Sequence, residues 1–281
     1  MSELRWHPLL EQWVVVSAHR QGRPQMPADW CPFCPGSGKV PEHYDVFLYP
    51  NDFPAFDGGC DVVLYSPEHT KLPSDLTVEQ WEKVIALWAK RTAEYEADPK
   101  VKHVAVFENT GEAVGVTMPH PHGQIYAFPF VPPRIEKELA ARSNRCIYCD
   151  ILAKEREART RLIIEGEHFD AFAPYHARFP YETNIYSRQC VRSLNDLTPA
   201  EKTDFARVLS RVRKKYDALF GFQMPLMMVL HQFRHFYVEF LPLQRTAQKL
   251  KYLAAVESAL GTFLEDVTPE DAAGALRLAG A

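Results

Sequence analysis

The sequence predicts an α+β protein in which one unit occurs twice. Segments of the two halves can be aligned without gaps, and each half contains one long helix between strand-like segments. The last two strands of each half follow each other too closely for a helical crossover, so we expect them to pair antiparallel. The 281 residues, of which 46% are hydrophobic and 24% charged, are sufficient for one large domain or two small ones.

The repeat is visible in short aligned segments. An offset of 121 residues places Ser66 on Ser187, at the end of the tripeptides Leu-Tyr-Ser and Ile-Tyr-Ser. An offset of 115 residues superposes the two CxxC pairs, and an offset of 116 superposes NDFPAF on HFDAF. We therefore expect an N-terminal unit over residues 1–142 and a C-terminal unit over residues 143–281.

Within each unit the elements are expected in one order: a CxxC knuckle, an aromatic stretch, an apolar strand, a helix and two more strands. The helices are predicted over 78–98 and 199–220, because each follows a threonine cap and begins with acidic residues. The later strands are predicted in the segments 101–109, 122–131, 225–233 and 235–243. Residues 249–281 are predicted to form a closing helix with a tail.

The charge balance excludes some classes of partner. The net charge of −4 argues against broad electrostatic binding to nucleic acid, which needs a basic face, but phosphorylated small molecules remain possible ligands.

The N-terminus lacks the basic-then-apolar order of a signal peptide, and no apolar run approaches the ~20 residues of a membrane span. We expect a soluble, cytoplasmic protein with no membrane partner.

Four of the six cysteines form two CxxC pairs, and each pair is followed by further cysteine or histidine residues at matching positions. The predicted ligand sets are Cys31, Cys34, His69 and His120 in the first unit and Cys146, Cys149, Cys190 and His235 in the second. Cys190 falls on His69, an exchange that zinc tolerates because it binds either donor. We expect two closed structural zinc sites, with iron as an alternative in the second. A buried thiol pair or a redox motif is the alternative for a lone CxxC.

The segment Pro-His-Pro-His-Gly-Gln contains the candidate nucleophile. His120 and His122 alternate along an extended strand, so both side chains emerge on one face, about 7 Å apart. One can bind metal, and His122 then suits a nucleophile, since a neutral imidazole carries a lone pair. Gly123 permits close approach of a phosphate, and the Gln124 amide can donate to a phosphoryl oxygen. The alternative is a hydrogen-bonded polar histidine without a chemical role.

The second unit lacks this pair. The offset of 115 residues keeps a histidine at His235, but it places Tyr237 on His122 and Glu239 on Gln124. We expect the second unit to be non-catalytic.

Segments from Arg5 to the C-terminus carry a resemblance to a known family. They are RWHPLLEQWVVVSAHRQGRP, CPFC, NDFPAF, SPEHTK, VFENTG, PHPHGQIYAF, HFDAFAPYHARFPYET and LPLQRTAQKLKYLAAVE. Together they resemble the galactose-1-phosphate uridylyltransferase family, the transferase branch of the histidine-triad superfamily. The resemblance implies duplicated histidine-triad units that share an antiparallel sheet flanked by helices, assembled as a homodimer.

The activity implied by the resemblance is that of a UDP-glucose–hexose-1-phosphate uridylyltransferase of galactose metabolism. His122 would take the uridylyl group from UDP-glucose, and galactose 1-phosphate would collect it in a ping-pong reaction that yields UDP-galactose. Gln124 would steady the uridylyl-histidine intermediate.

The resemblance also implies substrate contacts. Arg20 and Arg23 match basic residues near the phosphates, for which a solvated turn is the alternative. The other matching residues are Asn51, Asp52 and Phe53 for the uridine, Asn109 as the asparagine of the Phe-Glu-Asn motif, Thr117 where a serine contacts phosphate, and Lys251, Tyr252 and Glu257 for the hexose phosphate. An Asx turn is the alternative for the uridine segment.

Two departures bear on the acceptor and the second metal. Val256 and Phe263 stand where members of the family carry polar sugar contacts, which keeps open a nucleotide-sugar phosphorylase or a non-catalytic zinc-stabilised nucleotide-binding protein. A hydrolase is disfavoured, because histidine-triad hydrolases carry a histidine at the position of Gln124. Glu138 and His231 match two ligands of a second metal found in the family, but the remaining histidine pair is replaced, so the set with the second CxxC pair is preferred.

Overall fold

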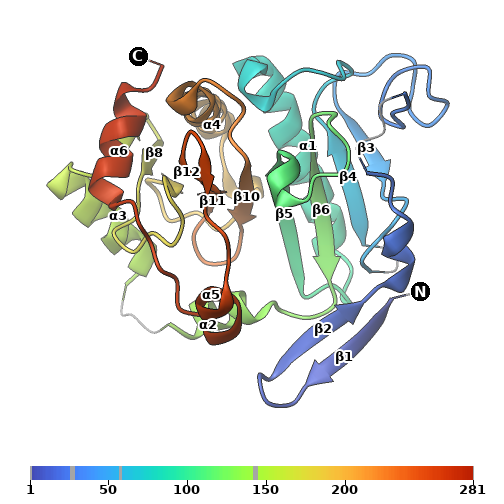
Figure 1. The fold of residues 1–281 in the computed structure, drawn as a ribbon, viewed down its shortest axis with the longest axis horizontal. Helices are drawn as coiled ribbons and strands as arrows, with labels where there is room; N and C mark the ends of the chain where they lie inside the picture. The colour runs from blue at the N-terminus through green and yellow to red at the C-terminus, as the bar shows by residue number, and fades with distance from the viewer. Residues whose placement is uncertain (1, 26–28, 57–58, 142–144, 281) are drawn as a thin grey trace. The chain divides into compact units, whose positions relative to one another are not determined.

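The computed structural model describes residues 2–25, 29–56, 59–141 and 145–280 of the chain (Figure 1). The chain forms two compact units. The first comprises Met1–Lys71, Lys83–Phe107 and Thr117–Asn144, and the second comprises Leu72–Glu82, Glu108–Val116 and Arg145–Ala281. The second unit thus includes two segments from the first half of the sequence. The predicted boundary between residues 142 and 143 lies outside the described residues, and the division into two domains there stays a prediction.

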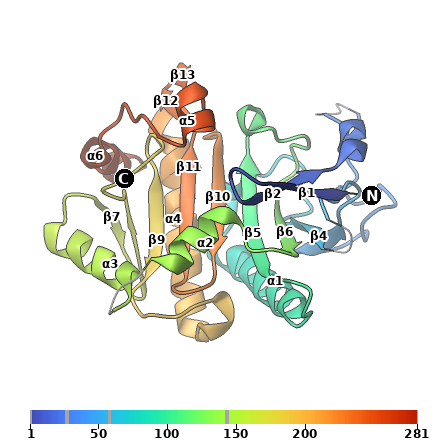
Figure 2. The ribbon, with the colours of Figure 1, turned by 90° about the horizontal axis from the view of Figure 1, so that it is seen from below.

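The first unit contains a separate hairpin and a set of antiparallel strands in the order β3-β4-β6-β5. The strands are β1 (Glu3–His7), β2 (Gln12–Val16), β3 (Phe47–Pro50), β4 (Cys60–Leu64), β5 (His103–Thr110) and β6 (His122–Phe128). The helices are α1 (Val78–Glu96) and α2 (Pro133–Ala140), and α1 runs along strands β4 to β6 (Figure 2). The first residues of α1 and the last three of β5 belong to the second unit.

The second unit orders its antiparallel strands β10-β11-β9-β8-β7. The strands are β7 (Leu162–Glu165), β8 (Phe169–Phe172), β9 (Thr183–Ser187), β10 (Leu226–His231), β11 (Tyr237–Pro242), β12 (Gln244–Thr246) and β13 (Lys249–Leu250). The helices are α3 (Ile147–Ala158), α4 (Pro199–Phe220), α5 (Ala255–Leu260) and α6 (Pro269–Leu278). Helix α4 contacts β8, and α6 contacts both β7 and α4.

Local sequence explains both long helices. The Thr198 side chain accepts from the backbone N–H of Glu201, whose carboxylate returns the bond, and this capping box starts α4. The hydroxyl of Thr77 accepts from the N–H of Gln80 at the start of α1. Gly221 ends α4 with φ of 76°, a conformation that costs glycine little. Both predicted helices are confirmed.

The predicted strand pairing is also confirmed. β5 pairs antiparallel with β6, and β10 pairs antiparallel with β11. The α+β class is therefore correct: each unit combines antiparallel strands with helices. None of the described helices combines the length and the apolar character needed to cross a membrane.

The C-terminal segment differs from the prediction of a closing helix with a tail over 249–281. It contains the short strand β13 and two helices, α5 and α6. Gly261 terminates α5 with φ of 68°, and Thr268 caps a new helix that has proline at its first position. The helix stop at Gly261 and the new helix start at Thr268 divide the segment into two helices, whereas one helix followed by a tail was expected.

In the second unit a buried tyrosine occupies the position that corresponds to the candidate nucleophile. The counterpart, Tyr237, is 3% exposed and packs in a cluster with Tyr148 and Leu152 of α3 and Tyr186 of β9. His231 stacks on the Tyr237 ring at 4.2 Å with 4° between the planes. Helix α3, which starts at the second CxxC pair and was not predicted, therefore covers this face of β11.

Two buried carboxylates lie next to this cluster. Arg178 Nη2 donates to Glu239 Oε1 at 2.8 Å. Glu182 accepts from the backbone N–H groups of Arg178 and Phe179, at 2.7 and 3.2 Å. Burial, with the Glu239 carboxylate adding to it, raises the pKa of Glu182 to about 7 against the opposing effect of these hydrogen bonds.

Glu182→Gln should change the pH dependence of stability. Between the ordinary pKa of 4.5 and the folded value of about 7, only the unfolded state releases the proton, so the wild type loses stability as the pH rises. That loss is on the order of 3 kcal/mol, and the glutamine variant lacks it. Urea unfolding at about pH 5 and pH 8 measures the effect as the difference between variant and wild type at each pH, which cancels contributions common to both proteins.

Glu167→Gln, at an exposed carboxylate, is the matched control and should follow the wild type. Parallel pH profiles for wild type and Glu182→Gln would show that Glu182 is ionised in the folded state throughout.

Candidate functional site

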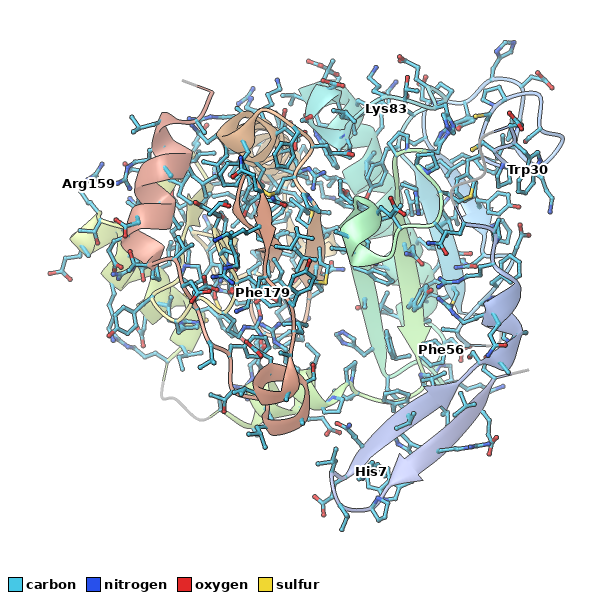
Figure 3. The ribbon with its side chains drawn as sticks, in the orientation of Figure 1. His7, Trp30, Phe56, Lys83, Arg159 and Phe179 are labelled. Atoms are coloured by element: carbon cyan, nitrogen blue, oxygen red, sulfur yellow. The ribbon has the colours of Figure 1, made fainter. Side chains whose placement is uncertain are left out.

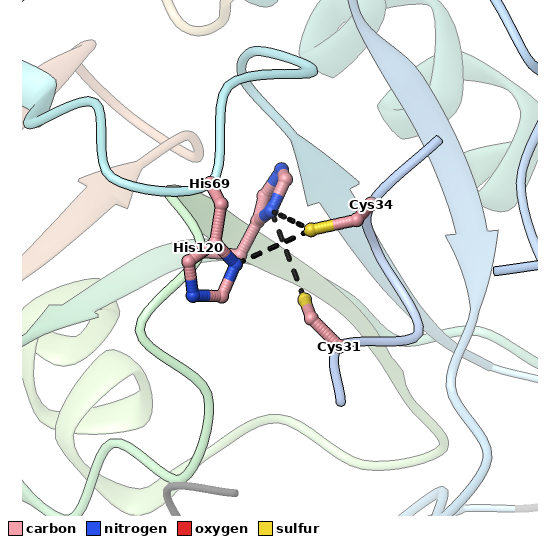
Figure 4. Close-up of side chains that lie close together, drawn as sticks. All are labelled: Cys31, Cys34, His69 and His120. Atoms are coloured by element: carbon pink, nitrogen blue, oxygen red, sulfur yellow. Dashed lines mark hydrogen bonds between the residues drawn. The ribbon is translucent and has the colours of Figure 1, made fainter. Parts of the chain in front are cut away.

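The first predicted ligand set comes together around one point. Cys34 Sγ lies 3.3 Å from His69 Nδ1 and 3.7 Å from His120 Nδ1, and Cys31 Sγ lies 3.8 Å from His120 Nδ1 (Figure 4). All four ligand atoms lie within 4.8 Å of one another. A tetrahedral zinc ion, with bonds of about 2.3 Å to sulfur and 2.0 Å to nitrogen, separates such atoms by about 3.5 Å. The donors therefore fit a metal ion.

The second predicted set is assembled in the same way. His235 Nδ1 lies 3.6 Å from Cys146 Sγ and 3.7 Å from Cys149 Sγ. Cys190 completes the group, whose ligand atoms also lie within 4.8 Å of one another. Both groups use four protein donors, so either one suits a closed structural site.

The repeated serines hold the metal-facing histidines. His120 Nε2 donates to the carbonyl oxygen of Ser66 at 2.7 Å, and His235 Nε2 donates to that of Ser187 at 3.0 Å. In both cases Nδ1 is left to face the cysteines, because a carbonyl oxygen can only accept. The aligned Ser66 and Ser187 thus accept the same histidine hydrogen bond in each of the two units.

Burial shifts the pKa values of both the histidine and the cysteine donors. It lowers the pKa of His120 to about 4 and also lowers the pKa of His235, so both imidazoles are neutral at neutral pH. It raises the pKa of the Cys31 and Cys149 thiols to about 12. A bound cation offsets that effect, since the thiolate is the form that binds metal.

His122 lies on β6, two residues beyond His120, and its side chain is half-buried. Its Nδ1 donates to the carbonyl oxygen of His120 at 2.7 Å. This bond fixes the neutral tautomer in which Nε2 carries the lone pair. His122 belongs to neither metal group, and its ring lies 5.5 Å from that of Phe33.

Gly123 has a packing role that was not predicted, whereas the close approach of a phosphate stays a prediction. A Cβ atom at this position would lie 2.1 Å from the hydroxyl oxygen of Tyr65 and 3.1 Å from the carbonyl oxygen of Phe107. Alternation along the strand directs that atom away from the face of His122 and Gln124. The glycine is thus needed for packing behind the strand.

Gln124 is engaged by a residue that was not predicted to be part of the site. Tyr126 Oη donates to Gln124 Oε1 at 3.0 Å, and Arg20 Nη1 donates to Tyr126 Oη at 3.2 Å. The same Arg20 nitrogen lies 2.9 Å from the carbonyl oxygen of Phe53. Arg20 sits in the 3₁₀ helix Ala18–Gly22, so this turn is joined to β6 and to the predicted uridine segment.

The uridine segment adopts the Asx turn that was its alternative. Asn51 Oδ1 accepts from the backbone N–H of Phe53 at 2.8 Å. Asp52 Oδ2 accepts from Tyr49 Oη at 2.7 Å. The turn leaves the Asp52 side chain exposed and the Phe53 side chain half-buried.

The remaining predicted substrate residues belong to both units. Arg23 is exposed and Thr117 is half-buried, both in the first unit. Asn109 lies two residues beyond Phe107 on β5, but it is counted with the second unit. Tyr252 is 75% exposed in the second unit.

Lys251 is buried, and carboxylates of its own segment balance its positive charge. Its Nζ lies 3.7 Å from carboxylate oxygens of Glu257 and Glu265, and it donates to the carbonyl oxygen of Leu264. Phe263 packs 5.6 Å from the ring of Phe179, which Figure 3 labels within the second unit. The segment is thus held by ion pairs within itself and by packing against Phe179.

The two residues that matched an alternative metal site have other partners. Arg134 Nε donates to Glu138 Oε1 at 2.9 Å in the first unit. His231 stacks on Tyr237 in the second unit. Among the described residues, the groups with metal-ligand geometry are the two cysteine and histidine sets.

Sequence reasoning missed Tyr126 and Tyr44. Tyr44 Oη donates to the carbonyl oxygen of Phe33 at 2.7 Å and lies 3.2 Å from His120 Nε2. Tyr126 shares the alternation of His122 and Gln124 along β6, so its place on their face could have been inferred. No local signal points to Tyr44, because its contacts join distant parts of the chain.

Two family models match the chain: galactose-1-phosphate uridyl transferase, N-terminal domain, over residues 52–132, and its C-terminal domain over residues 134–279. Galactose-1-phosphate uridylyltransferase from Thermotoga maritima is 39% identical, covering 99% of this chain and 98% of the relative. The Haemophilus influenzae protein of that name is 31% identical, covering 97% and 93%. A solved uridylyltransferase structure, 31% identical, superposes with a TM-score of 0.90, covering 99% of this chain and 98% of that one. The chain therefore belongs to the galactose-1-phosphate uridyl transferase family.

Proposed function

We propose that the protein transfers a uridylyl group from UDP-glucose to a hexose 1-phosphate, galactose 1-phosphate in the first instance, through a covalent intermediate on His122. The observation that carries the proposal is the 2.7 Å bond from His122 Nδ1 to the carbonyl oxygen of His120. It directs the lone pair to Nε2 of a half-buried imidazole outside both metal groups. Membership of the transferase family supports the same reaction.

The chemistry divides into two steps. The His122 Nε2 lone pair attacks the α-phosphorus of UDP-glucose, a P–N bond forms, and the P–O bond to the β-phosphate breaks as glucose 1-phosphate leaves. A phosphate oxygen of galactose 1-phosphate then attacks the same phosphorus, and the P–N bond breaks. The phosphoramidate conserves the energy of the bond for the second acceptor.

Gln124 suits an enzyme that transfers rather than hydrolyses. A carboxamide can donate to a phosphoryl oxygen, yet it cannot take up a proton from water in the way a histidine can. The uridine is assigned to Asn51, Asp52 and Phe53, the phosphates to Arg20, Arg23 and Thr117, and the hexose phosphate to Lys251, Tyr252 and Glu257, with Asn109 as a further substrate contact.

Replacing the nucleophile tests the function directly. His122→Gly should abolish the uridylyl adduct that denaturing mass spectrometry detects after incubation with UDP-glucose. It should also lower label exchange between UDP-glucose and glucose 1-phosphate by at least about 10³-fold, because no covalent route remains. His43→Gly, at an exposed loop histidine, is the control and should keep both signals. Absence of an adduct in the wild type at any pH would instead identify a nucleotide-binding protein without turnover.

We assign zinc to both cysteine and histidine groups, as structural ions that tie together the loops and, in the second unit, the start of α3 from which the ligands come. Neither ion takes part in the transfer, because four protein donors leave no position for substrate.

Cys31→Ser and Cys146→Ser should each lower the zinc content by about one ion per chain and lower the melting temperature, since metal binding at such sites is coupled to folding. Atomic absorption and thermal unfolding provide the two measurements. Cys60→Ser is the matched control, because Cys60 belongs to neither group, and it should keep both ions. Unchanged metal content in both ligand variants would reject the assignment.

A nucleotide-sugar phosphorylase is the second candidate. It is favoured by Lys251, which is already neutralised by Glu257 and Glu265, and by Phe263 in place of a polar sugar contact. In this case inorganic phosphate replaces the sugar phosphate as the acceptor. Isolating the adduct and offering galactose 1-phosphate or inorganic phosphate separates the two functions, because only the true acceptor discharges it rapidly.

The homodimer that the resemblance implies remains a proposal. Sedimentation velocity over a range of protein concentrations tests it.

A further inference from the structure

We propose that Tyr126 is a positioning residue for the transfer reaction: it orients the Gln124 carboxamide, and Arg20 holds the Tyr126 hydroxyl in the direction that this requires. The proposal rests on the function proposed above, because Gln124 is given its role there. It adds two contacts that neither the repeat nor the motif around His122 indicated.

The three residues on β6 lie in a row. His122, Gln124 and Tyr126 occupy alternate positions of the strand and so share one face. Tyr126 Oη lies 3.0 Å from Gln124 Oε1, and Arg20 Nη1 lies 3.2 Å from Tyr126 Oη. The contacts form a continuous relay from the guanidinium group to the amide.

The direction of the relay follows from the chemistry of its members. A guanidinium group only donates, so the Tyr126 oxygen accepts from Arg20. Burial raises the pKa of the Tyr126 hydroxyl, which therefore keeps its proton at neutral pH, and that proton is available for Gln124 Oε1. If the Gln124 amide were inverted, its Nε2 group would face the Tyr126 hydroxyl oxygen, which already accepts from the Arg20 guanidinium group. The relay thus selects the amide orientation with the carbonyl oxygen toward Tyr126.

The consequence concerns the other end of the amide. With Oε1 held by Tyr126, the Nε2 amino group faces the opposite direction, and Gln124 lies between Tyr126 and His122 along the strand. Its two N–H donors are therefore oriented before substrate arrives. Donors that are already oriented need no reorganisation when charge develops on the phosphoryl oxygens.

Packing fixes the tyrosine ring. Tyr126 is 7% exposed and lies in an aromatic cluster (Figure 3 labels Phe56), with ring centroids 6.2 Å from Phe56 and 4.9 Å from Phe107, both at 85° between planes. Edge-to-face contacts of this kind restrict rotation of the ring. The position of the hydroxyl is therefore set by the core, whereas a glutamine side chain alone has several accessible rotamers.

Tyr126→Phe removes the hydroxyl and keeps the ring. We expect the single-turnover rates of uridylyl-His122 formation and of its discharge to fall by about 10-fold each, which is the effect of losing one orienting hydrogen bond. KM for UDP-glucose should change by less than about threefold, since the nucleotide contacts remain. Tyr95→Phe is the matched control: its buried hydroxyl donates to Asp61 at 2.6 Å, away from Gln124, so its loss should affect stability and leave both rates unchanged.

A double-mutant cycle with Gln124→Ala distinguishes positioning from general structural damage. If Tyr126 acts through Gln124, the double variant should be no slower than Gln124→Ala alone. Additive losses, or unchanged rates in Tyr126→Phe, would overturn the proposal. Should Tyr126→Phe fold poorly, Arg20→Lys keeps the positive charge but loses the planar fork. Its single-turnover rates are then measured at saturating UDP-glucose, so that the loss of its assigned substrate contact in binding does not enter, and the same non-additivity with Gln124→Ala is expected in those rates. Failure of the wild type to form an adduct would overturn the proposed function instead, so the two failures are distinguishable.

Discussion

One residue, His120, connects the metal group to the candidate nucleophile. Its imidazole faces two cysteines through Nδ1 and donates to the Ser66 carbonyl oxygen through Nε2, so both ring nitrogens are held. Its backbone carbonyl oxygen accepts from His122 Nδ1 at 2.7 Å. Because the side chain holds the backbone in place, the acceptor that selects the tautomer of His122 is held as well. The cysteine and histidine group that could hold a metal ion and the candidate nucleophile are therefore two parts of one arrangement.

The repeat allows the two units to be compared position by position. His235 and Ser187 repeat the contact of the first unit, yet the position that matches His122 holds Tyr237 beneath helix α3. Tyr237 is packed in a cluster with Tyr148, Leu152 and Tyr186, where the first unit has the half-buried His122. At the position of Gln124 the second unit has Glu239, whose carboxylate is paired with Arg178 because a buried carboxylate needs a partner.

Features set by neighbours along the chain were predictable from the sequence. The threonine caps and the glycine stop locate the ends of α4, and the closely spaced strands pair antiparallel as expected. Both ligand sets were found through the repeat, which provided an internal comparison for every cysteine and histidine. The C-terminal segment was predicted wrongly because the glycine and proline signals at 261 and 269 were given too little weight.

The sequence alone was enough to define the repeated unit, the two ligand sets and the alternation that puts His122 and Gln124 on one face, because periodicity and spacing are local properties of a chain. Folding was needed to bring Arg20 to Tyr126, to place Tyr65 behind Gly123 and to lay α3 over Tyr237. These contacts join residues far apart in sequence. Their partners are selected by the packing of whole elements, and no short segment contains that information.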